Sequence, residues 1–525
     1  MSSVLTRTAL GSGTARNVYF WAGLFLFLLL LKLCHLHILW AEEGYGSAAA
    51  VQILHGKLLY RDFWFDKPPL AALVYVLWHG RAGFGLRVAD AVYAWACAAA
   101  AYRLARHLWS EREGIFAACL MAFFLVFDLP ASITTLAPDL LLIFPALAAI
   151  DCAARRRSFW AGVWCAIGLA VNAKGVLILA VCLVWSWPSV VPLLLGFAIA
   201  SAPWFVWLAM YHALPDYWQQ VWWFGAQYSR DTFVVHPWIE GFTRTLHWAG
   251  FHAAVVIAAA ICVARRKLWK SAPWLIWIAA GIAGIIAGER FFERYYFLLL
   301  PPVIVLAACG ITQVARRWQA LILLLLAIPL GRFGPRYAML AGDLIGGRAT
   351  HWSDVLLNDD SKQVAQVIRS RAQPGNTLLV WGYRPDIFAY TQLPAAGRFL
   401  DSQLLTGVIA DRHLTSTQVS FPSLAAANRQ QLTTLRPTWI VDGLSPINPA
   451  LAITAYPDLR QWFNRNYTQC GSTQNSVIYC LRQRAAALGS PPSYRSSPAS
   501  IRIGSTFSLS GSGQVAYGVN VQGGL

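Results

Sequence analysis

The sequence predicts a polytopic α-helical membrane protein that carries a small α/β domain near its C-terminal end. Of its 525 residues, 57% are hydrophobic and only 13% are charged, whereas soluble domains contain about 45–50% apolar and about 25% charged residues. The apolar residues form long continuous blocks instead of one face of a helical period, which indicates membrane spans. We therefore expect the lipid bilayer to surround most of the chain.

The apolar blocks predict about eleven spans, given the length that is needed to cross a bilayer. They cover residues 18–40, 84–104, 114–128, 138–153, 158–171, 175–188, 190–210, 245–263, 273–288, 296–314 and 318–333. The first block is longer than the apolar core of a cleaved signal peptide, so we expect it to remain as a span. Residues 1–17 are then a short cytoplasmic N-terminus.

The distribution of positive charge predicts the orientation. The strongest basic clusters are Arg103 to Arg112, Arg155 to Arg157, Arg265 to Lys270, and Arg316 with Arg317. With a cytoplasmic N-terminus, all of them fall on the cytoplasmic side of a plasma or inner membrane, as the positive-inside rule requires. The net charge of +18 is then explained by anionic headgroups, and no nucleic-acid partner is predicted. The loops 41–83, 129–137, 211–244 and 289–295 face the periplasm or exterior.

Residues 334–487 have the composition of a globular domain on that same outer face. Residues 361–372 have helical spacing, and residues 377–381 and 439–442 are short apolar strands, which together predict a small extracytoplasmic α/β domain. Cys470 and Cys480 lie ten positions apart within it, and either a disulfide or two free thiols is compatible with their spacing. Residues 488–525 are rich in Ser, Gly and Pro and are predicted to be a disordered tail.

The loop after the first span holds the densest cluster of chemically capable residues. It reads Ala41-Glu42-Glu43-Gly44-Tyr45, then an apolar helix-like stretch to Leu54, then Gly56, Tyr60-Arg61-Asp62-Phe63 and Asp66-Lys67-Pro68-Pro69-Leu70. Two carboxylates directly at the end of a span are costly near hydrocarbon, which favours a functional role. The alternative is a solvated helix cap.

This order of residues resembles the first loop of the polyprenyl-phosphate-sugar-dependent glycosyltransferases with the multispan GT-C fold. That group includes protein O-mannosyltransferases and lipid A aminoarabinose transferases. The resemblance covers roughly residues 18–310 and implies a GT-C-like catalytic domain over residues 18–333. It also implies that the acidic residue at the end of the first span is catalytic, which places Glu42, with Glu43 beside it, in that role. The family usually has aspartate first, so the choice between the two glutamates stays open.

The chemistry of sugar transfer explains these residue types. A carboxylate near the acceptor can take the hydroxyl proton, and cations are needed at the departing phosphate, whose charge grows as the bond breaks. Lys67 is the first candidate for phosphate binding, held by a backbone that Pro68 and Pro69 stiffen. The alternative for Lys67 is a lysine that snorkels to the interface.

Further candidates lie on the same predicted face. Asp139 opens the fourth span and resembles the second acidic position of the family, so we expect it to be catalytic together with Glu42 and Glu43. The alternative is a helix-start carboxylate that the helix dipole favours. Lys174 is similar in position to a lysine of the family that contacts the lipid phosphate, so the resemblance implies that Lys174 binds phosphate. The remaining residues that we expect to bind substrate or phosphate are Tyr45, Arg290, Arg294 and Tyr296. Arginine suits bidentate phosphate contact, although both arginines have glutamates nearby with which they can pair.

The sequence thus predicts an inverting hexosyl- or pentosyltransferase that moves a sugar from a polyprenyl-phosphate donor to an outward-facing hydroxyl of a lipid, glycan or protein. No cofactor is assigned, because His55 and His79 lack ligand partners at metal-binding spacing. Whether the protein binds a divalent metal ion stays an open alternative. The alternative is a transporter or flippase of polyprenyl-linked lipid or sugar. Transporters place their charges near the midplane and repeat their halves, whereas these charges gather at one face and no repeat is apparent.

Overall fold

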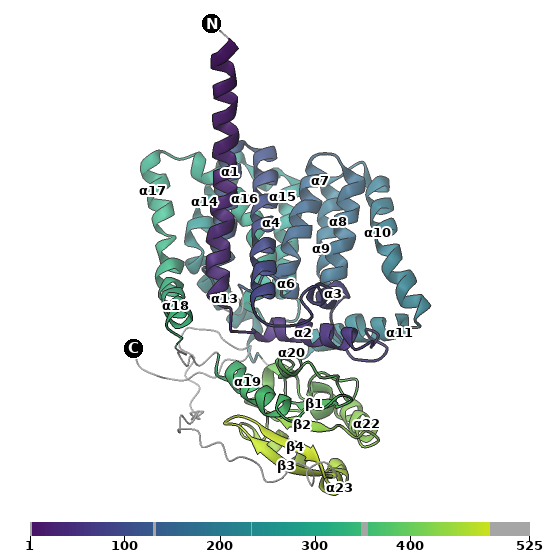
Figure 1. Cartoon of the computed structure of the whole chain (residues 1–525). Coiled ribbons are helices and arrows are strands. Elements are labelled where there is room, and N and C mark those ends of the chain that lie inside the picture. The colour runs from purple at the N-terminus through teal and green to yellow at the C-terminus, as the bar shows by residue number, and fades with distance from the viewer. Residues whose placement is uncertain (1–2, 130–132, 233, 348–354, 483–525) are drawn as a thin grey trace.

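The computed structural model describes residues 3–129, 133–232, 234–347 and 355–482, with side chains from residue 17 onward. The predicted tail, residues 488–525, lies outside the described residues. The chain is mostly helical and ends in a small mixed sheet (Figure 1). This composition confirms the predicted combination of a helical bundle with a C-terminal α/β domain.

The long helices run side by side as a bundle, except α13 (Pro237–Phe251), which is bent by 92° from the helix that follows it (Figure 1). They are α1 (Ser3–Leu33), α4 (Phe84–Leu108), α5 (Glu111–Phe124), α7 (Ile143–Ala154), α8 (Ser158–Val171), α9 (Gly175–Trp185), α10 (Val190–Met210), α13 (Pro237–Phe251), α14 (Ala253–Arg266), α15 (Ala272–Ile286), α16 (Leu300–Thr312), α17 (Arg316–Leu324) and α18 (Ala327–Gly346). The last of these helices crosses the expected domain boundary at residue 334.

Glycines allow several of these helices to approach closely. A Cβ atom at Gly162 of α8 would lie 1.9 Å from the carbonyl oxygen of Leu193 on α10, and one at Gly310 of α16 would lie 1.8 Å from that of Ala258 on α14. Small residues at helix contacts are typical of packing inside a bilayer, where van der Waals contact replaces the hydrophobic effect between helices.

Fewer helices than expected meet the length and apolarity of a span. Within the described chain, only α10 is long and apolar enough to cross a membrane alone. The bent pairs α13 with α14 (92°) and α17 with α18 (42°) raise the number to three. The apolar part of α1 (Asn17–Leu33) and four other apolar helices are too short, and α4 carries Arg87 and Asp90 within its first turns. The count of eleven therefore stays a prediction.

The basic clusters meet at the end of the bundle that holds the N-terminus. Arg155 donates to the carbonyl oxygen of Arg103 over 3.0 Å, and the neighbouring ring of Tyr102 packs 5.1 Å from Trp21 in α1. The opposite end of the bundle carries α2 (Ala41–Leu54), which lies across it, and beyond α2 lies the C-terminal domain (Figure 1). The positive charge and the C-terminal domain therefore occupy opposite ends.

Short elements connect the bundle at the end near α2. They are α3 (Leu70–Val76), α6 (Pro138–Leu141), α11 (Leu214–Tyr217), the π-helical η2 (Trp218–Trp223), α12 (Phe224–Arg230) and the 3-10 helix η4 (Glu293–Leu298). A further 3-10 helix, η3 (Leu268–Lys270), follows α14.

The C-terminal domain is built on a four-stranded sheet with the order β1-β2-β4-β3. The strands are β1 (Leu378–Trp381), β2 (Trp439–Asp442), β3 (Tyr467–Ser472) and β4 (Val477–Leu481). The first two strands pair in parallel and the other pairs are antiparallel. Its helices are α19 (Leu356–Arg369), α20 (Asp386–Thr391), α21 (Gln403–Thr406), η5 (Ala410–Arg412), α22 (Pro422–Leu432), η6 (Pro449–Leu451), η7 (Ile453–Ala455) and α23 (Pro457–Asn466).

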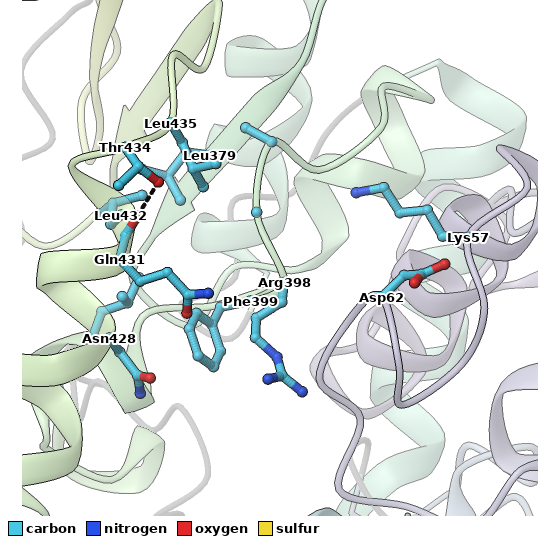
Figure 2. A pocket seen from close by; sticks show the side chains of 13 residues that line it. Lys57, Asp62, Leu379, Arg398, Phe399, Asn428, Gln431, Leu432, Thr434 and Leu435 are labelled. Carbon is cyan, nitrogen blue, oxygen red and sulfur yellow. Dashed lines mark hydrogen bonds between the residues drawn. The ribbon is translucent and has the colours of Figure 1, made fainter. Parts of the chain in front are cut away.

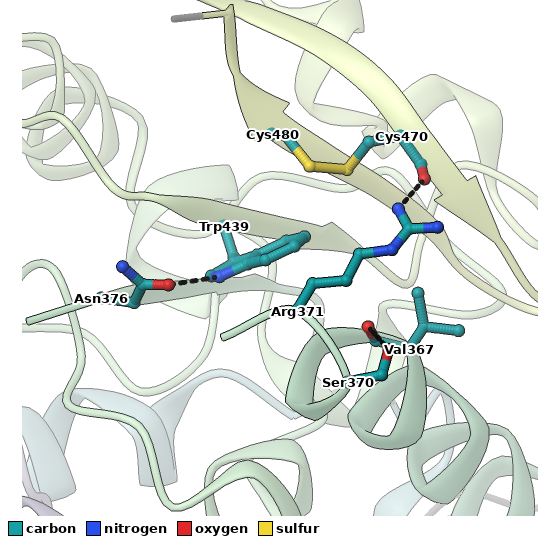
Figure 3. The surroundings of a disulfide bond; sticks show 7 residues. All are labelled: Val367, Ser370, Arg371, Asn376, Trp439, Cys470 and Cys480. Atoms are coloured by element: carbon teal, nitrogen blue, oxygen red, sulfur yellow. Dashed lines mark hydrogen bonds between the residues drawn. A yellow bond between two sulfur atoms is a disulfide. The ribbon is translucent and has the colours of Figure 1, made fainter. Parts of the chain in front are cut away.

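A disulfide joins Cys470 on β3 to Cys480 on β4, with 5.8 Å between the two Cα atoms. The spacing of these cysteines allowed either a disulfide or two free thiols, and the structure has the disulfide. Arg371 donates to the carbonyl oxygen of Cys470 over 3.2 Å, as Figure 3 shows. The disulfide ties the edge strand β3 to the rest of the sheet.

The C-terminal domain and the first loop, residues 41–70, share one hydrophobic core. Ala48 and Ala49 of α2 and Phe63 of the loop belong to the same buried cluster as Phe388 and Trp439 of the C-terminal domain. Such a cluster marks one contiguous core. The domain is therefore packed into the bundle end instead of being tethered to it.

Hydrogen bonds reinforce this interface. The amide of Ala395 donates to Oε1 of the fully buried Gln52 over 2.7 Å, and the amide of Trp64 donates to the carbonyl oxygen of Arg398 over 2.6 Å. Buried polar groups of this kind fix one geometry, because leaving either partner unsatisfied costs about 1–3 kcal/mol. The first loop thus has a defined position relative to the C-terminal domain.

Candidate functional site

Four of the predicted site residues meet at the end of the bundle near α2. Glu42, in the first turn of α2, accepts a hydrogen bond from Nη1 of Arg294. Nε of Arg294 lies 3.6 Å from Asp139, and Nζ of Lys174 lies 3.0 Å from the same carboxylate. Residues from four separate parts of the chain therefore form one chain of alternating charges, which we call the Glu42 cluster (Glu42, Asp139, Lys174 and Arg294).

The elements around the Glu42 cluster explain its position. Pro138 starts the short helix α6 and leaves Asp139 in its first turn, where a carboxylate is favoured by the helix dipole. Lys174 precedes α9 and also lies over the ring of Tyr295, with 3.4 Å from Nζ to the ring centroid. Asn172 donates to Asp139 over 3.1 Å. The carboxylates and cations of the cluster are between 16% and 20% exposed, so water screens their attraction only in part.

Lys67 lies beside the Glu42 cluster. With 38% of its side chain exposed, it is more accessible to solvent than the two cations of the cluster. Its Nζ is 2.9 Å from Asp66. Burial lowers the pKa of Lys67, but the charges of Asp66 and Glu42 outweigh that effect and raise the pKa above its ordinary value. Lys67 therefore stays charged at physiological pH. Pro69 caps α3 directly afterwards, so the backbone around Lys67 is stiff.

The turn before Lys67 is held by buried hydrogen bonds. Tyr60 has a φ angle of 69°, which is rare for a residue with a side chain. Its hydroxyl donates to the carbonyl oxygen of Lys67 over 2.8 Å, and its own carbonyl oxygen accepts from the Gln220 amide over 2.8 Å. The other end of the Gln220 amide accepts from the backbone N–H of Phe65. Gln220 is fully buried, and nothing in its sequence context pointed to this role.

Glu43 has different surroundings from Glu42. It is fully buried, and Nη1 and Nη2 of Arg87 donate to its two oxygens over 2.9 and 2.7 Å. Arg87 also lies 3.3 Å from Asp90, which in turn lies 3.2 Å from Lys32. Both oxygens of Glu43 are thus occupied within a closed network of charges between α1, α2 and α4.

Two predicted phosphate ligands lie in other surroundings. Arg290 is buried and donates to the carbonyl oxygens of Tyr228 and Asp231 over 3.0 and 2.6 Å, with Asp411 of the C-terminal domain 3.4 Å away. Tyr296 packs on Trp248, and its hydroxyl lies 2.7 Å from that of Thr245. The structure does not bring these two side chains to the Glu42 cluster, whereas the neighbouring Tyr295 does contact it.

Tyr45 belongs to an aromatic stack that reaches the C-terminal domain. Its ring stacks on Phe65 at 4.9 Å and on Tyr383 at 6.1 Å. The charge of Glu42 acts on Tyr383, whose pKa is raised by burial first and by nearby carboxylates second. Tyr45 thus links the first loop to the C-terminal domain beside the Glu42 cluster.

Asp401 of the C-terminal domain is a site residue that the sequence did not single out. Its side chain is 5% exposed and accepts a hydrogen bond from the amide of Gln403 over 2.9 Å. Burial, together with the charge of Asp66, raises the pKa of Asp401 to about 7, although the Gln403 N–H and Lys67 act in the opposite direction. Asp401 lies more than 330 positions from Lys67 in the sequence, so no local pattern connects them.

Metal binding has no assigned residues. Within the described ranges, no three His, Cys, Asp or Glu side chains converge as metal ligands.

Comparisons with known proteins give a structural match at low sequence identity. No family model and no curated protein sequence matches the chain. The ArnT protein of Cupriavidus metallidurans bound to undecaprenyl phosphate matches with a TM-score of 0.58 and 14% identity over 91% of this chain and all of that one. Its apo form matches with a TM-score of 0.56 and 13% identity, over 89% and 98%.

The chain has the GT-C fold of ArnT. This match confirms the fold that the first loop implied, since ArnT is a lipid A aminoarabinose transferase. An oligosaccharyltransferase of Archaeoglobus fulgidus, solved with Zn and sulfate, also matches, with a TM-score of 0.48 and 14% identity over 87% of this chain and 73% of that one. The match to ArnT spans both the bundle and the C-terminal domain.

Proposed function

We propose that this chain is a membrane glycosyltransferase that moves a sugar from a polyprenyl-phosphate donor to an acceptor hydroxyl with inversion at the anomeric carbon. One observation carries the proposal. A carboxylate, Glu42, and the cations Lys67, Lys174 and Arg294 meet at one end of a bundle whose fold matches that of an undecaprenyl-phosphate-bound transferase. These are the groups that a base-assisted displacement of a phosphate requires.

Glu42 is the base in this proposal, and Glu43 positions it. Glu43 cannot take a proton from a substrate while both of its oxygens bind Arg87 in a closed site. It instead anchors the first turn of α2, since its carboxylate also accepts the backbone N–H of Trp40 over 3.3 Å. Glu42 is half-buried and faces the cluster, so it is the accessible carboxylate of the pair.

Lys67, Lys174 and Arg294 bind the phosphate of the donor in this proposal. Before the donor arrives, Arg294 is shared between Glu42 and Asp139, and Lys174 is held by Asp139. A bound phosphate competes with the carboxylates for Arg294 and leaves Glu42 without its ion pair. Asp139 keeps Lys174 in place throughout, as a positioning residue.

The transfer then proceeds in one displacement. The acceptor oxygen forms a bond to the anomeric carbon while its proton passes to Glu42. The bond between that carbon and the phosphate oxygen breaks on the opposite face, and its electron pair stays on the polyprenyl phosphate. The cations stabilise the charge that grows there.

The membrane topology of this enzyme follows from the charge distribution. We propose about eleven spans with the N-terminus and the basic clusters on the cytoplasmic side. The Glu42 cluster and the C-terminal domain lie at the other end of the bundle and face the periplasm or exterior, where a lipid, glycan or protein supplies the acceptor hydroxyl.

Replacing each glutamate separately tests the assignment. Glu42→Gln should lower transfer from a labelled polyprenyl-phosphate sugar to a membrane-extract acceptor by about 10²–10⁴-fold and leave donor binding intact. Glu43→Gln should lower thermal stability, and Glu240→Gln, an outlying carboxylate on α13, is the control. Full transfer activity in the Glu42→Gln protein would refute the role of Glu42.

The transporter alternative makes an opposite prediction. It requires movement of labelled polyprenyl phosphate between the leaflets of reconstituted vesicles without any sugar transfer. A dithionite-quenching assay on the wild-type chain separates the two functions, because a transferase changes the lipid chemically and leaves its leaflet distribution unaltered.

A further inference from the structure

A polar cavity of about 260 Å³ lies between the first loop and the C-terminal domain. Lys57 and Asp62 of the first loop form one wall, and Asn428 and Gln431 of α22 form the opposite wall, as Figure 2 shows. Arg398 lies between the two walls. None of these five side chains belongs to the Glu42 cluster.

Several polar groups in this cavity have hydrogen-bonding capacity that the protein does not use. Nε of Arg398 is buried and has no partner among the described residues. The side chain of Gln431 is exposed and makes no hydrogen bond within the described part of the chain, and Figure 2 shows its amide beside Phe399. Asn428 donates to the carbonyl oxygen of Leu404 over 2.8 Å, which leaves its own amide oxygen for a ligand. A buried donor without a partner, such as Nε of Arg398, favours a polar ligand in a concave site, and the amides of Asn428 and Gln431 stand at the same cavity to join it.

The charge in the cavity favours an acidic ligand. Lys57 donates to the carbonyl oxygen of Ala395 over 2.5 Å, and no carboxylate in the described chain lies within ion-pair distance of it. The lining carboxylate, Asp62, already accepts from the backbone N–H of Leu58 and from Arg61, each over 2.8 Å. Arg398 is paired with Asp216, whose oxygen lies 3.3 Å from Nη2, so Lys57 is the lining cation that has no ion pair within the described chain. Lys57 therefore leaves a positive charge in the cavity, which suits a carboxylate or phosphate.

The rest of the lining suits a carbohydrate ring. Phe399 and several leucines contribute apolar surface beside the amides of Asn428 and Gln431. A sugar presents C–H faces to aromatic and aliphatic groups, and its hydroxyls both donate and accept, as side-chain amides do. An inorganic anion would use the cations but would leave the amides and the apolar surface without a function.

The cavity is connected to the proposed active site by two short segments. Arg398 donates to the carbonyl oxygen of Tyr60 over 3.3 Å, and the Tyr60 hydroxyl donates to the backbone of Lys67. Three residues after Arg398, Asp401 lies close enough to Asp66 and Lys67 for their charges to act on its pKa. A ligand in the cavity is thus held behind the loop that carries Lys67.

We propose that this cavity binds an acidic sugar, meaning a carbohydrate ring that bears a carboxylate or phosphate, as part of an acceptor glycan. Binding of the acidic sugar depends on the cavity alone, whereas its role as acceptor rests on the proposed function. The acidic sugar binds in the cavity, and a hydroxyl on another part of the acceptor glycan reaches Glu42. Binding at a distance from the reacting group holds that hydroxyl in position for transfer.

The binding experiment uses the full chain in lipid nanodiscs and measures affinity by saturation-transfer NMR. The probes are glucuronic acid, glucose 6-phosphate, glucose and inorganic phosphate. Lys57→Met and Gln431→Ala remove a charge and an amide from the cavity. Lys362→Met, an ion-paired lysine on α19, and Gln430→Ala, a neighbour on α22 that is also exposed but does not line the cavity, are the matched controls.

The two acidic sugars should bind, and each cavity variant should weaken that binding about fivefold while the controls keep wild-type affinity. Unfolding midpoints of all four variants establish that they are folded. Affinity that is unchanged in both cavity variants would overturn the proposal. So would binding of inorganic phosphate as tight as that of the acidic sugars, or equal binding of neutral glucose.

The acceptor role has a separate readout. With an acceptor glycan in hand, Lys57→Met should raise the KM for acceptor without changing the KM for donor. Loss of acidic-sugar binding with no change in acceptor KM would remove the acceptor role and leave the binding site. If the wild-type chain transfers no sugar from any polyprenyl-phosphate donor, the proposed function fails while the binding data still stand.

Discussion

Replacing Asp401 with asparagine should stabilise the protein at alkaline pH and leave it unchanged in acid. The carboxyl of Asp401 is buried beside Asp66, and its pKa rises from 3.8 to about 7. Below pH 4 the group is protonated in both the folded and the unfolded chain, so it has no effect on stability. Between pH 4 and 7 the unfolded chain loses its proton first, and the folded state becomes progressively less favourable.

The magnitude follows from that pKa. At 1.36 kcal/mol per pH unit, the rise to about 7 corresponds to at most about 4 kcal/mol of stability lost at pH 8. Asparagine removes the ionisation and keeps a side-chain oxygen that accepts the Gln403 N–H, which the wild type holds at 2.9 Å. The expected gain is therefore close to the full electrostatic cost.

The assay is the thermal unfolding midpoint of purified wild type and Asp401→Asn between pH 5 and 8. The midpoint of the wild type should fall by several degrees more than that of the variant over this range. Asp359→Asn, at a half-exposed carboxylate of α19, should retain the wild-type pH dependence. Identical pH slopes in wild type and Asp401→Asn would refute the reasoning, because the buried carboxyl would then titrate normally.

Three further outcomes are expected. Lys174→Met should weaken binding of polyprenyl phosphate by about tenfold or more, measured by titration in nanodiscs, and unchanged affinity would remove Lys174 from the phosphate site. Arg384→Met leaves the buried Asp360 without its ion-pair partner, which lies 3.1 Å away in the wild type. The free energy of chemical unfolding should fall by about 3–5 kcal/mol, and a loss below about 1 kcal/mol would contradict this. Replacing Cys470 and Cys480 together with alanine should cost roughly 2–3 kcal/mol, and an unchanged midpoint under oxidising conditions would show that the disulfide adds no stability.

Individual helices and strands were predictable because each is encoded by a local pattern of apolar and turn residues. The strand Trp439–Asp442 and the helix that follows Trp40 appear where apolar runs and turn residues predicted them. The number of membrane spans was harder to predict from the sequence. Apolar blocks are split into bent or short helices, such as α13 and α14, by packing that hydropathy does not encode.

The candidate site divides in the same way. Glu42, Asp139, Lys174 and Arg294 became candidates because each is a charge at the edge of an apolar block, where burial is costly without a function or a partner, and the family resemblance supported the first three. Gln220 and Asp401 were missed because their significance depends on which distant segments pack against them. Arg290 carried the same signal as Arg294, but its guanidinium contacts Tyr228 and Asp231 instead.

The single apolar core beneath α2 also bears on how this protein evolves and is assembled. Phe63 and Phe388, more than 300 positions apart, are buried in one cluster, so neither half presents a finished surface without the other. A newly made bundle therefore leaves an unfilled apolar face until the last third of the chain has been translated and folded. Exchange of C-terminal domains between homologues is likewise constrained, since a foreign domain would have to match the contour of α2 as well as any new substrate.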